Sequence, residues 1–143
     1  AKGGISRVFS DRIDSSRISR IAAVLEKHTS LRFSDQDIYV NVAGGMRIRE
    51  VGVDLPAALA LYSARTGIPL PPKTAAAGEL SLTGEIRPVP FIGKRVKSAS
   101  GYGIKNFFSS GPGAESETTG QKYKTAGTIN EIIKSLFSSK EKS

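Results

Sequence analysis

The chain has 143 residues, a hydrophobic fraction of 38% and an aromatic content of 7%, values typical of one globular domain large enough to bury a core. It carries 21 Lys and Arg against 13 Asp and Glu, a formal net charge of +8, and so basic a protein attracts polyanions, of which nucleic acid is the commonest. The absence of cysteine and the single histidine exclude disulfides and clustered thiolate or histidine metal sites. Without an apolar run of about eighteen residues or a signal-like N-terminus, we expect a cytoplasmic protein with no membrane partner.

The first part of the chain is expected to hold a linker, a short strand and a helix. Residues 1–4 have a linker-like composition that looks like the remnant of a longer polypeptide, and apolar residues over 5–9 predict a short strand. Apolar side chains then recur at helical spacing, and Asp14 or Ser15 is placed to cap this helix. We expect the helix to end near His28.

Two strands and a second helix are predicted next. Apolar and polar residues alternate over 37–43, which indicates a strand, and a glycine pair then turns the chain into a second strand over 46–51. A helix is predicted over 54–66, with Asp54 as its N-cap and Gly67 as its end.

The stretch over 78–97 is the one around which the chain is organised. A strand of small residues over 74–77 leads into it, and two leucines then alternate with hydroxyl residues. Gly84 permits a tight turn, and Pro90 suits the first turn of a helix. The pattern predicts a hairpin followed by a helix with positively charged residues near its start.

The C-terminal part continues with short elements. A helix over 90–100 is followed by a strand over 105–108, a flexible loop over 111–127, a helix over 128–137 and a disordered tail over 138–143. No repeat of fixed period is visible. Because some strands form hairpins between helices, we predict an α+β sandwich rather than a doubly wound parallel sheet.

Motifs for nucleotide hydrolysis and for acid–base catalysis have weak support. A phosphate-binding loop needs Ser or Thr after Gly-Lys, whereas Gly93-Lys94 is followed by Arg95. Glu79 and Glu85 flank the hairpin and could form an acid–base pair, but an ion pair with a neighbouring cation is the favoured interpretation.

A serine activated by a lysine is a third arrangement that needs no histidine. Ser63 lies in the middle of a predicted helix, where we expect it to bond a backbone carbonyl. Ser81 alternates with core leucines and is expected to face away from them. Neither serine is a persuasive nucleophile.

A basic run is the most suggestive chemical feature. Between residues 87 and 113 the sequence contains no acidic residue, and such a segment can line a groove against phosphates. A solvated helix face is the alternative interpretation. The candidate DNA-binding residues are Arg87, Lys94, Arg95, Lys97 and Lys105.

Several of these stretches together resemble a known family. Residues 37–45, the Asp-Leu pair at 54–55 with its alanine-rich helix, and residues 78–89 resemble the C-terminal domain of the bacterial DNA repair proteins of the RadA (Sms) family. Residues 13–27 look like the first helix of that domain. The resemblance covers residues 5 to about 108.

That domain is similar in turn to the proteolytic domain of Lon proteases, on a fold shared with a ribosomal protein and with small-molecule kinases of the GHMP type. The resemblance implies a Lon protease-like domain over 5–110. The Ser-Lys dyad of Lon falls on Gly52 and Gly93, with Lys94 one residue further on. Glycine offers no side chain for attack or proton transfer, so the resemblance implies a protease fold without catalytic residues.

The RadA family joins a zinc-binding segment, a RecA-like ATPase and this domain in a ring-forming motor that acts on branched recombination intermediates. The resemblance therefore implies a DNA-binding domain in a homo-oligomeric ring, expected to be hexameric, with double-stranded or branched DNA as partner. No cofactor is expected in these residues; ATP, Mg and Zn are expected only in the missing N-terminal parts. Two alternatives stay open: an active Ser-Lys peptidase using Lys94, and a scaffold that forms the ring without touching DNA.

Overall fold

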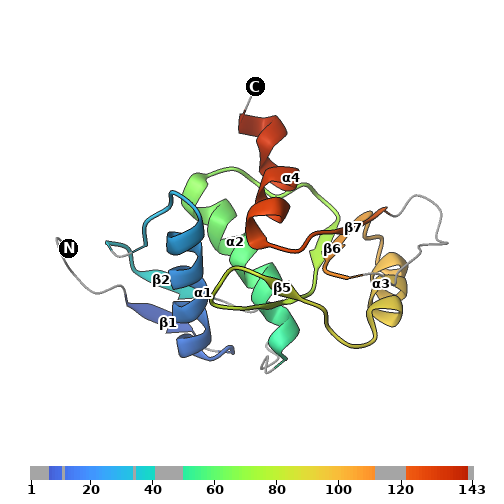
Figure 1. Ribbon diagram of the computed structural model, residues 1–143, viewed down its shortest axis with the longest axis horizontal. Helices are drawn as coiled ribbons and strands as arrows, with labels where there is room; N and C mark the ends of the chain where they lie inside the picture. The colour runs from blue at the N-terminus through green and yellow to red at the C-terminus, as the bar shows by residue number, and fades with distance from the viewer. Residues whose placement is uncertain (1–6, 11, 34, 41–49, 112–121, 142–143) are drawn as a thin grey trace.

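The structure, a computed structural model, describes residues 7–10, 12–33, 35–40, 50–111 and 122–141 (Figure 1). Helices and short strands are interleaved along this part of the chain. The helical elements are α1 (Ser15–His28), η1 (Val51–Val53), α2 (Asp54–Thr66), α3 (Ile92–Gly101) and α4 (Ile129–Glu141). The strands are β1 (Val8–Ser10), β2 (Ile38–Val40), β3 (Thr74–Ala76), β4 (Glu79–Leu80), β5 (Ile86–Arg87), β6 (Asn106–Ser109) and β7 (Lys122–Thr125).

The first helix follows its sequence signals closely. The Asp14 side chain caps α1 by accepting a hydrogen bond from the Ser16 backbone N–H at 3.1 Å. Its apolar positions are buried, and its last turn carries Lys27 and His28, which suit the negative end of the helix dipole. The predicted start and end of this helix are confirmed.

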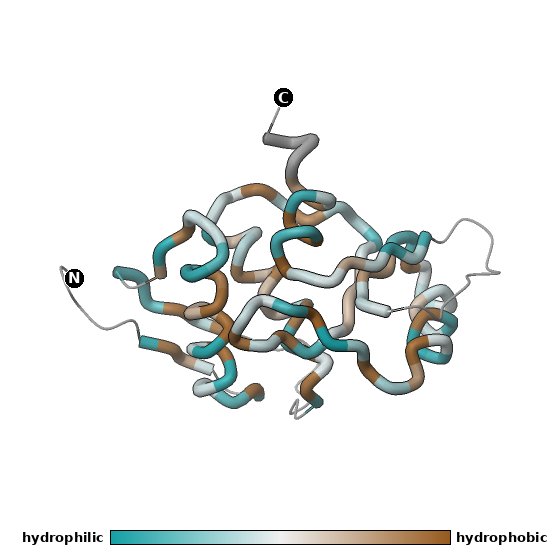
Figure 2. Tube along the Cα trace, viewed as in Figure 1, coloured by the Kyte–Doolittle hydropathy of each residue, from teal (hydrophilic) through white to brown (hydrophobic). Residues whose placement is uncertain are grey.

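One large core lies between α1, α2 and α4. Leu25, Leu55, Ile129 and Phe137 are fully buried there, and the rings of Phe137 and Tyr62 pack at a centroid distance of 4.7 Å. The helices in Figure 2 carry both hydrophobic and hydrophilic positions, the amphipathic pattern by which each helix buries one side. Within the described residues, none of the helices is long and apolar enough to cross a membrane.

The strands form two small parallel sheets and one hairpin. β1 pairs with β2, and the second sheet has the order β3-β6-β7. The hairpin β4-β5 is antiparallel and turns at Gly84, whose φ of 86° favours glycine. The mixture of parallel sheets, a hairpin and helices is compatible with the predicted α+β class.

The sheet β3-β6-β7 lies between two layers. Phe107 of β6 packs with Val96 of α3 in a small second core, whereas the next residue, Phe108, packs into the large core. Adjacent strand residues point to opposite faces, so α3 covers one face of this sheet and the large core covers the other. In Figure 1, α3 lies beside β6 and β7, on the opposite side of the molecule from β1 and β2.

The structure corrects part of the predicted C-terminal organisation. The predicted flexible loop over 111–127 contains β7, which pairs in parallel with β6 from Lys122 to Thr125. The last helix continues to Glu141, into the predicted disordered tail over 138–143. A Ser/Lys/Glu composition suggested disorder, but a helix already anchored by buried residues can extend through such residues at little cost.

The N-terminus of α2 differs from the prediction. Asp54 does not cap α2: it is the first residue of the helix, Val53 occupies the cap position, and no side-chain cap bond is made there. The predicted linker over 1–4 and most of the strand over 46–51 lie outside the described residues, and the end of that stretch, Val51, lies in η1.

Candidate nucleic-acid interface

The segment from the hairpin to α3 presents several cations to solvent. Arg87 ends β5 opposite Glu79 in the register of the hairpin, and its side chain is exposed. Val89 is buried two residues later and anchors the connection to α3 in the small core. The hairpin therefore holds Arg87 beside the start of α3.

The residue before α3 is a solvent-exposed phenylalanine in an unusual backbone conformation. Phe91 has φ 60° and ψ 37°, in the left-handed region, and is 68% exposed. A bulky residue there costs of order 1–3 kcal/mol. The ammonium group of Lys94 lies 5.5 Å from the centroid of the Phe91 ring, within reach of a cation–π interaction. The sequence analysis did not single out Phe91, whose only local signal is its position directly after Pro90.

Arg95 differs from the other predicted cations because it has partners within the chain. Its Nε donates a hydrogen bond to the Pro90 carbonyl at 2.8 Å, and its guanidinium forms an ion pair with Glu50. The residue is half-buried. These contacts fix the first turn of α3 against the segment that precedes η1, so Arg95 holds the helix in place.

Lys94, Lys97 and Lys105 are exposed. Lys94 and Lys97 are three residues apart on α3 and share one face, whereas Lys105 directly precedes β6, beyond the other end of the helix. In the described part of the chain, none of these lysines forms an ion pair with a carboxylate. Lys94 and Lys97 thus lie on α3, Arg87 lies on the hairpin that leads into this helix, and Lys105 follows its far end.

The two positions matched to the Lon dyad lie on neighbouring segments. Gly52 is buried in η1, and a Cβ built on it would lie 3.2 Å from Val89 Cγ1 and 3.1 Å from Glu50 Oε1. Gly93 is exposed in the first turn of α3. The ion pair between Glu50 and Arg95 joins the two segments, since Glu50 comes two residues before Gly52 and Arg95 two residues after Gly93.

The two serines that are weak candidates for a nucleophile, and Glu85 of the Glu79–Glu85 pair, make local contacts. Ser63 donates to the Ile68 carbonyl at 2.7 Å, as expected for a serine in a helix. Ser81 lies 3.0 Å from the Thr83 hydroxyl and accepts from the Glu85 backbone N–H at 3.1 Å. The Glu85 carboxylate accepts from Thr83 at 3.3 Å. These contacts stabilise the turn of the hairpin.

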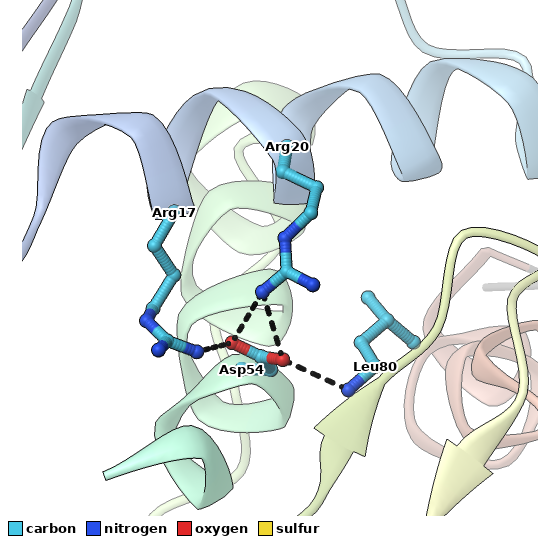
Figure 3. Close-up of polar contacts among 4 residues, drawn as sticks. All are labelled: Arg17, Arg20, Asp54 and Leu80. Atoms are coloured by element: carbon cyan, nitrogen blue, oxygen red, sulfur yellow. Dashed lines mark hydrogen bonds and ion pairs between the residues drawn. The ribbon is translucent and has the colours of Figure 1, made fainter. Parts of the chain in front are cut away.

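A buried carboxylate fixes the scaffold on which the hairpin rests (Figure 3). Asp54 is fully buried; its Oδ1 accepts from Arg17 at 2.8 Å and its Oδ2 lies 3.3 Å from Arg20. Oδ2 also accepts from the Leu80 backbone N–H at 3.0 Å. One carboxylate thus joins α1, α2 and β4. The sequence analysis missed this cluster, because its members are far apart along the chain.

Two pockets in the described part of the chain are lined by other residues. A pocket of about 390 Å³ lies beside Thr29 at the end of α1, and a pocket of about 200 Å³ lies beside Tyr39. None of the five predicted cations lines either pocket. In the residues that the structure describes, no group of three His, Cys, Asp or Glu side chains could hold a metal ion.

Fold and surface together define an α+β domain with an exposed cationic helix beside a hairpin. Residues 9–111 match the family model described as subunit ChlI of Mg-chelatase, and the chain belongs to this family. It is also similar to proteins named DNA repair protein RadA, which confirms the predicted resemblance. That of Treponema pallidum is 50% identical over 140 residues, 96% of this chain, and that of Streptococcus pyogenes serotype M3 is 34% identical over 137 residues, 94% of it. That of Brucella abortus is 45% identical over 92 residues, 64% of it.

The chain spans only a minor part of these relatives. It covers 30% of the Treponema and Streptococcus proteins and 20% of the Brucella protein.

Proposed function

We propose that the chain is the DNA-binding, non-proteolytic part of a RadA-type DNA repair protein, on a fold like that of the Lon proteolytic domain. The observation that carries the proposal is the group of exposed cations around α3, defined by Arg87, Lys94 and Lys97, none of which is ion-paired with a described carboxylate. We name this group the α3 surface. The relatives' name, DNA repair protein, supports DNA as the polyanion.

The chemistry of the α3 surface suits the DNA backbone better than base edges. Arg87 can make bidentate contacts to a phosphate, and the two lysines act as point charges on flexible stems. Phosphate contacts position a protein on DNA without reading its sequence. Arg95 keeps α3 in place through Glu50, and Lys105 extends the positive charge beyond the end of the helix.

Under the same proposal, the chain is one part of a larger protein. By its resemblance to RadA, the whole protein is an ATP-dependent motor on branched recombination intermediates, assembled as a homo-oligomeric ring. ATP, Mg and Zn would bind outside this chain. Gly52 and Gly93 at the matched dyad positions support a domain that does not cleave peptides.

The experiment is a salt titration of DNA binding. Fluorescence anisotropy with a labelled duplex should give an affinity that falls linearly in log-log form with salt, by about 0.9 per phosphate contact. The variant Arg87→Gln/Lys94→Gln/Lys97→Gln should bind more weakly and lower this slope by about 2.7, the share of three contacts. A control with the same change in charge is Lys27→Gln/Arg32→Gln/Lys134→Gln, at exposed positions outside the α3 surface.

Four results would count against the proposal. An affinity that does not depend on salt, or a control variant as weak as the α3-surface variant, would remove the electrostatic argument. Cleavage of an unfolded protein by the chain, abolished by Lys94→Ala, would favour the peptidase alternative. A ring detected by light scattering without DNA binding would favour the scaffold alternative.

A further inference from the structure

At one end of the sheet β3-β6-β7, a lysine lies at the beginning of every strand. Lys73 precedes β3, Lys105 precedes β6 and Lys122 is the first residue of β7. Because the three strands are parallel, their beginnings lie at the same end of the sheet. We name these three residues the lysine row; only Lys105 was among the predicted DNA-binding residues.

Backbone hydrogen bonds hold the row together. Lys105 N–H donates to the Lys73 carbonyl at 2.8 Å, and Lys122 N–H donates to the Lys105 carbonyl at 2.8 Å. Neighbouring strands lie about 4.8 Å apart, so the backbone positions of the row span about 10 Å. All three residues are exposed, and within the described residues none is ion-paired with a carboxylate.

The other parallel sheet shows how the chain treats the same position elsewhere. Arg7 directly precedes β1 and Asp37 directly precedes β2, and their side chains form an ion pair at 3.0 Å. Opposite charges on neighbouring strands are favourable, whereas like charges are unfavourable. Lys73 and Lys105 hold the corresponding positions of the second sheet, because Thr74 pairs with Asn106, and they place like charges where the first sheet places an attractive pair. Lys122 pairs with Asn106, one position further along the strands.

The backbone of Lys73 adds a second unfavourable feature. Its φ is 58°, in the left-handed region where glycine or asparagine is preferred. The Lys73 carbonyl nevertheless accepts hydrogen bonds from the N–H groups of both Lys105 and Asn106. These bonds hold the Lys73 backbone in this conformation at the end of the sheet. The like charges of Lys73 and Lys105 and the left-handed conformation of Lys73 are both unfavourable for the stability of the domain.

We propose that the lysine row is a second contact for the phosphate backbone of DNA, beside the α3 surface. Phosphates of one DNA strand repeat about every 3.4 Å along the helix axis, so three flexible lysine side chains spread over about 10 Å of backbone can reach successive phosphates. Lysine stems adapt to the exact positions of the phosphates and carry no information about base sequence. The α3 helix ends at Gly101, four residues before Lys105, so the row lies past the C-terminal end of this helix. This inference rests on the proposed DNA binding.

The test compares three variants of the chain, each with three cations changed to glutamine. They are Lys73→Gln/Lys105→Gln/Lys122→Gln for the row, the α3-surface variant, and the control at Lys27, Arg32 and Lys134. Anisotropy with a labelled duplex over a series of salt concentrations gives the affinity and its log-log slope, thermal unfolding shows that each variant is folded, and light scattering gives its oligomeric state. The row variant should lose affinity and lower the slope by about 2.7, while the control keeps both.

The outcomes separate this inference from the proposed function. If the row variant binds like the unmodified chain while the α3-surface variant loses binding, the row is not a DNA contact and the proposed function stands. If the unmodified chain does not bind DNA, both fail. A change in oligomeric state of the row variant without a change in DNA affinity would assign the row to contacts between copies of the chain and overturn the inference. A control variant as weak as the row variant would also overturn it.

Discussion

Replacing Asp54 by asparagine is expected to destabilise the domain strongly. The carboxylate is fully buried, and each of its oxygens accepts a hydrogen bond, Oδ1 from Arg17 and Oδ2 from the Leu80 N–H. An asparagine amide has one oxygen and one NH₂ group, so either orientation places a donor against a donor. The change removes the negative charge and one acceptor at the same time.

The expected magnitude follows from burial. Attraction between unit charges 4 Å apart is about 4 kcal/mol at an effective dielectric constant of 20, and desolvation of a buried carboxylate offsets several kcal/mol of it. The Arg17 side chain is 19% exposed and the Arg20 side chain 37%, so water screens the second pair more strongly. Removing one partner from a buried pair typically costs about 3–5 kcal/mol, a large fraction of the 5–15 kcal/mol by which a domain is stable.

Urea unfolding followed by circular dichroism measures this loss. With an m value of about 1.5 kcal/mol/M, the midpoint of Asp54→Asn should fall by about 2–3 M. The matched control is Asp37→Asn, which removes the same charge from the exposed pair with Arg7 and should shift the midpoint far less. A double-mutant cycle with Arg17→Met should show coupling between positions 17 and 54. Equal midpoints for Asp54→Asn and Asp37→Asn would refute the argument.

Three further predictions test packing and pH dependence. Gly78→Ala places a Cβ about 2.7 Å from Ile86 Cγ2 and should lower the free energy of unfolding by about 1–3 kcal/mol, whereas Gly101→Ala, with no atom within 4 Å of its Cβ, should be neutral or stabilising in urea unfolding. Phe137→Ala should cost about 3–5 kcal/mol in the same assay, because the ring is fully buried; a smaller loss would mean that α4 contributes little to the core. Hydrogen bonding to its guanidinium partner lowers the pKa of Asp37, so the stabilisation is present above the usual aspartate pKa and is lost as pH falls through the lowered value. The stabilities of the unmodified chain and Asp37→Asn, measured by urea unfolding from neutral to acidic pH, should converge at the acidic end, and a difference that grows on acidification would contradict this sign.

Sequence alone determined those features whose signals are local. The capping aspartate at position 14, the apolar period of α1, the glycine that closes α2 and the glycine turn of the hairpin each act within a few residues of the chain. The resemblance to RadA was also visible in short runs of sequence, and the comparisons confirm it. The basic run that begins at Arg87 was visible in the sequence, but the sequence did not show which of its cations are exposed.

Tertiary structure decided the features whose partners are distant. Asp54 is a residue type that often caps helices. It is instead buried beside Arg17 and Arg20, more than thirty residues earlier in the chain, and its carboxylate joins three elements. β7 forms because β6 offers it an edge to pair with, although its own sequence is mostly polar. The lysine row exists because three parallel strands begin at the same end of one sheet. Pairing between strands, and not spacing along the chain, decides which charges become neighbours.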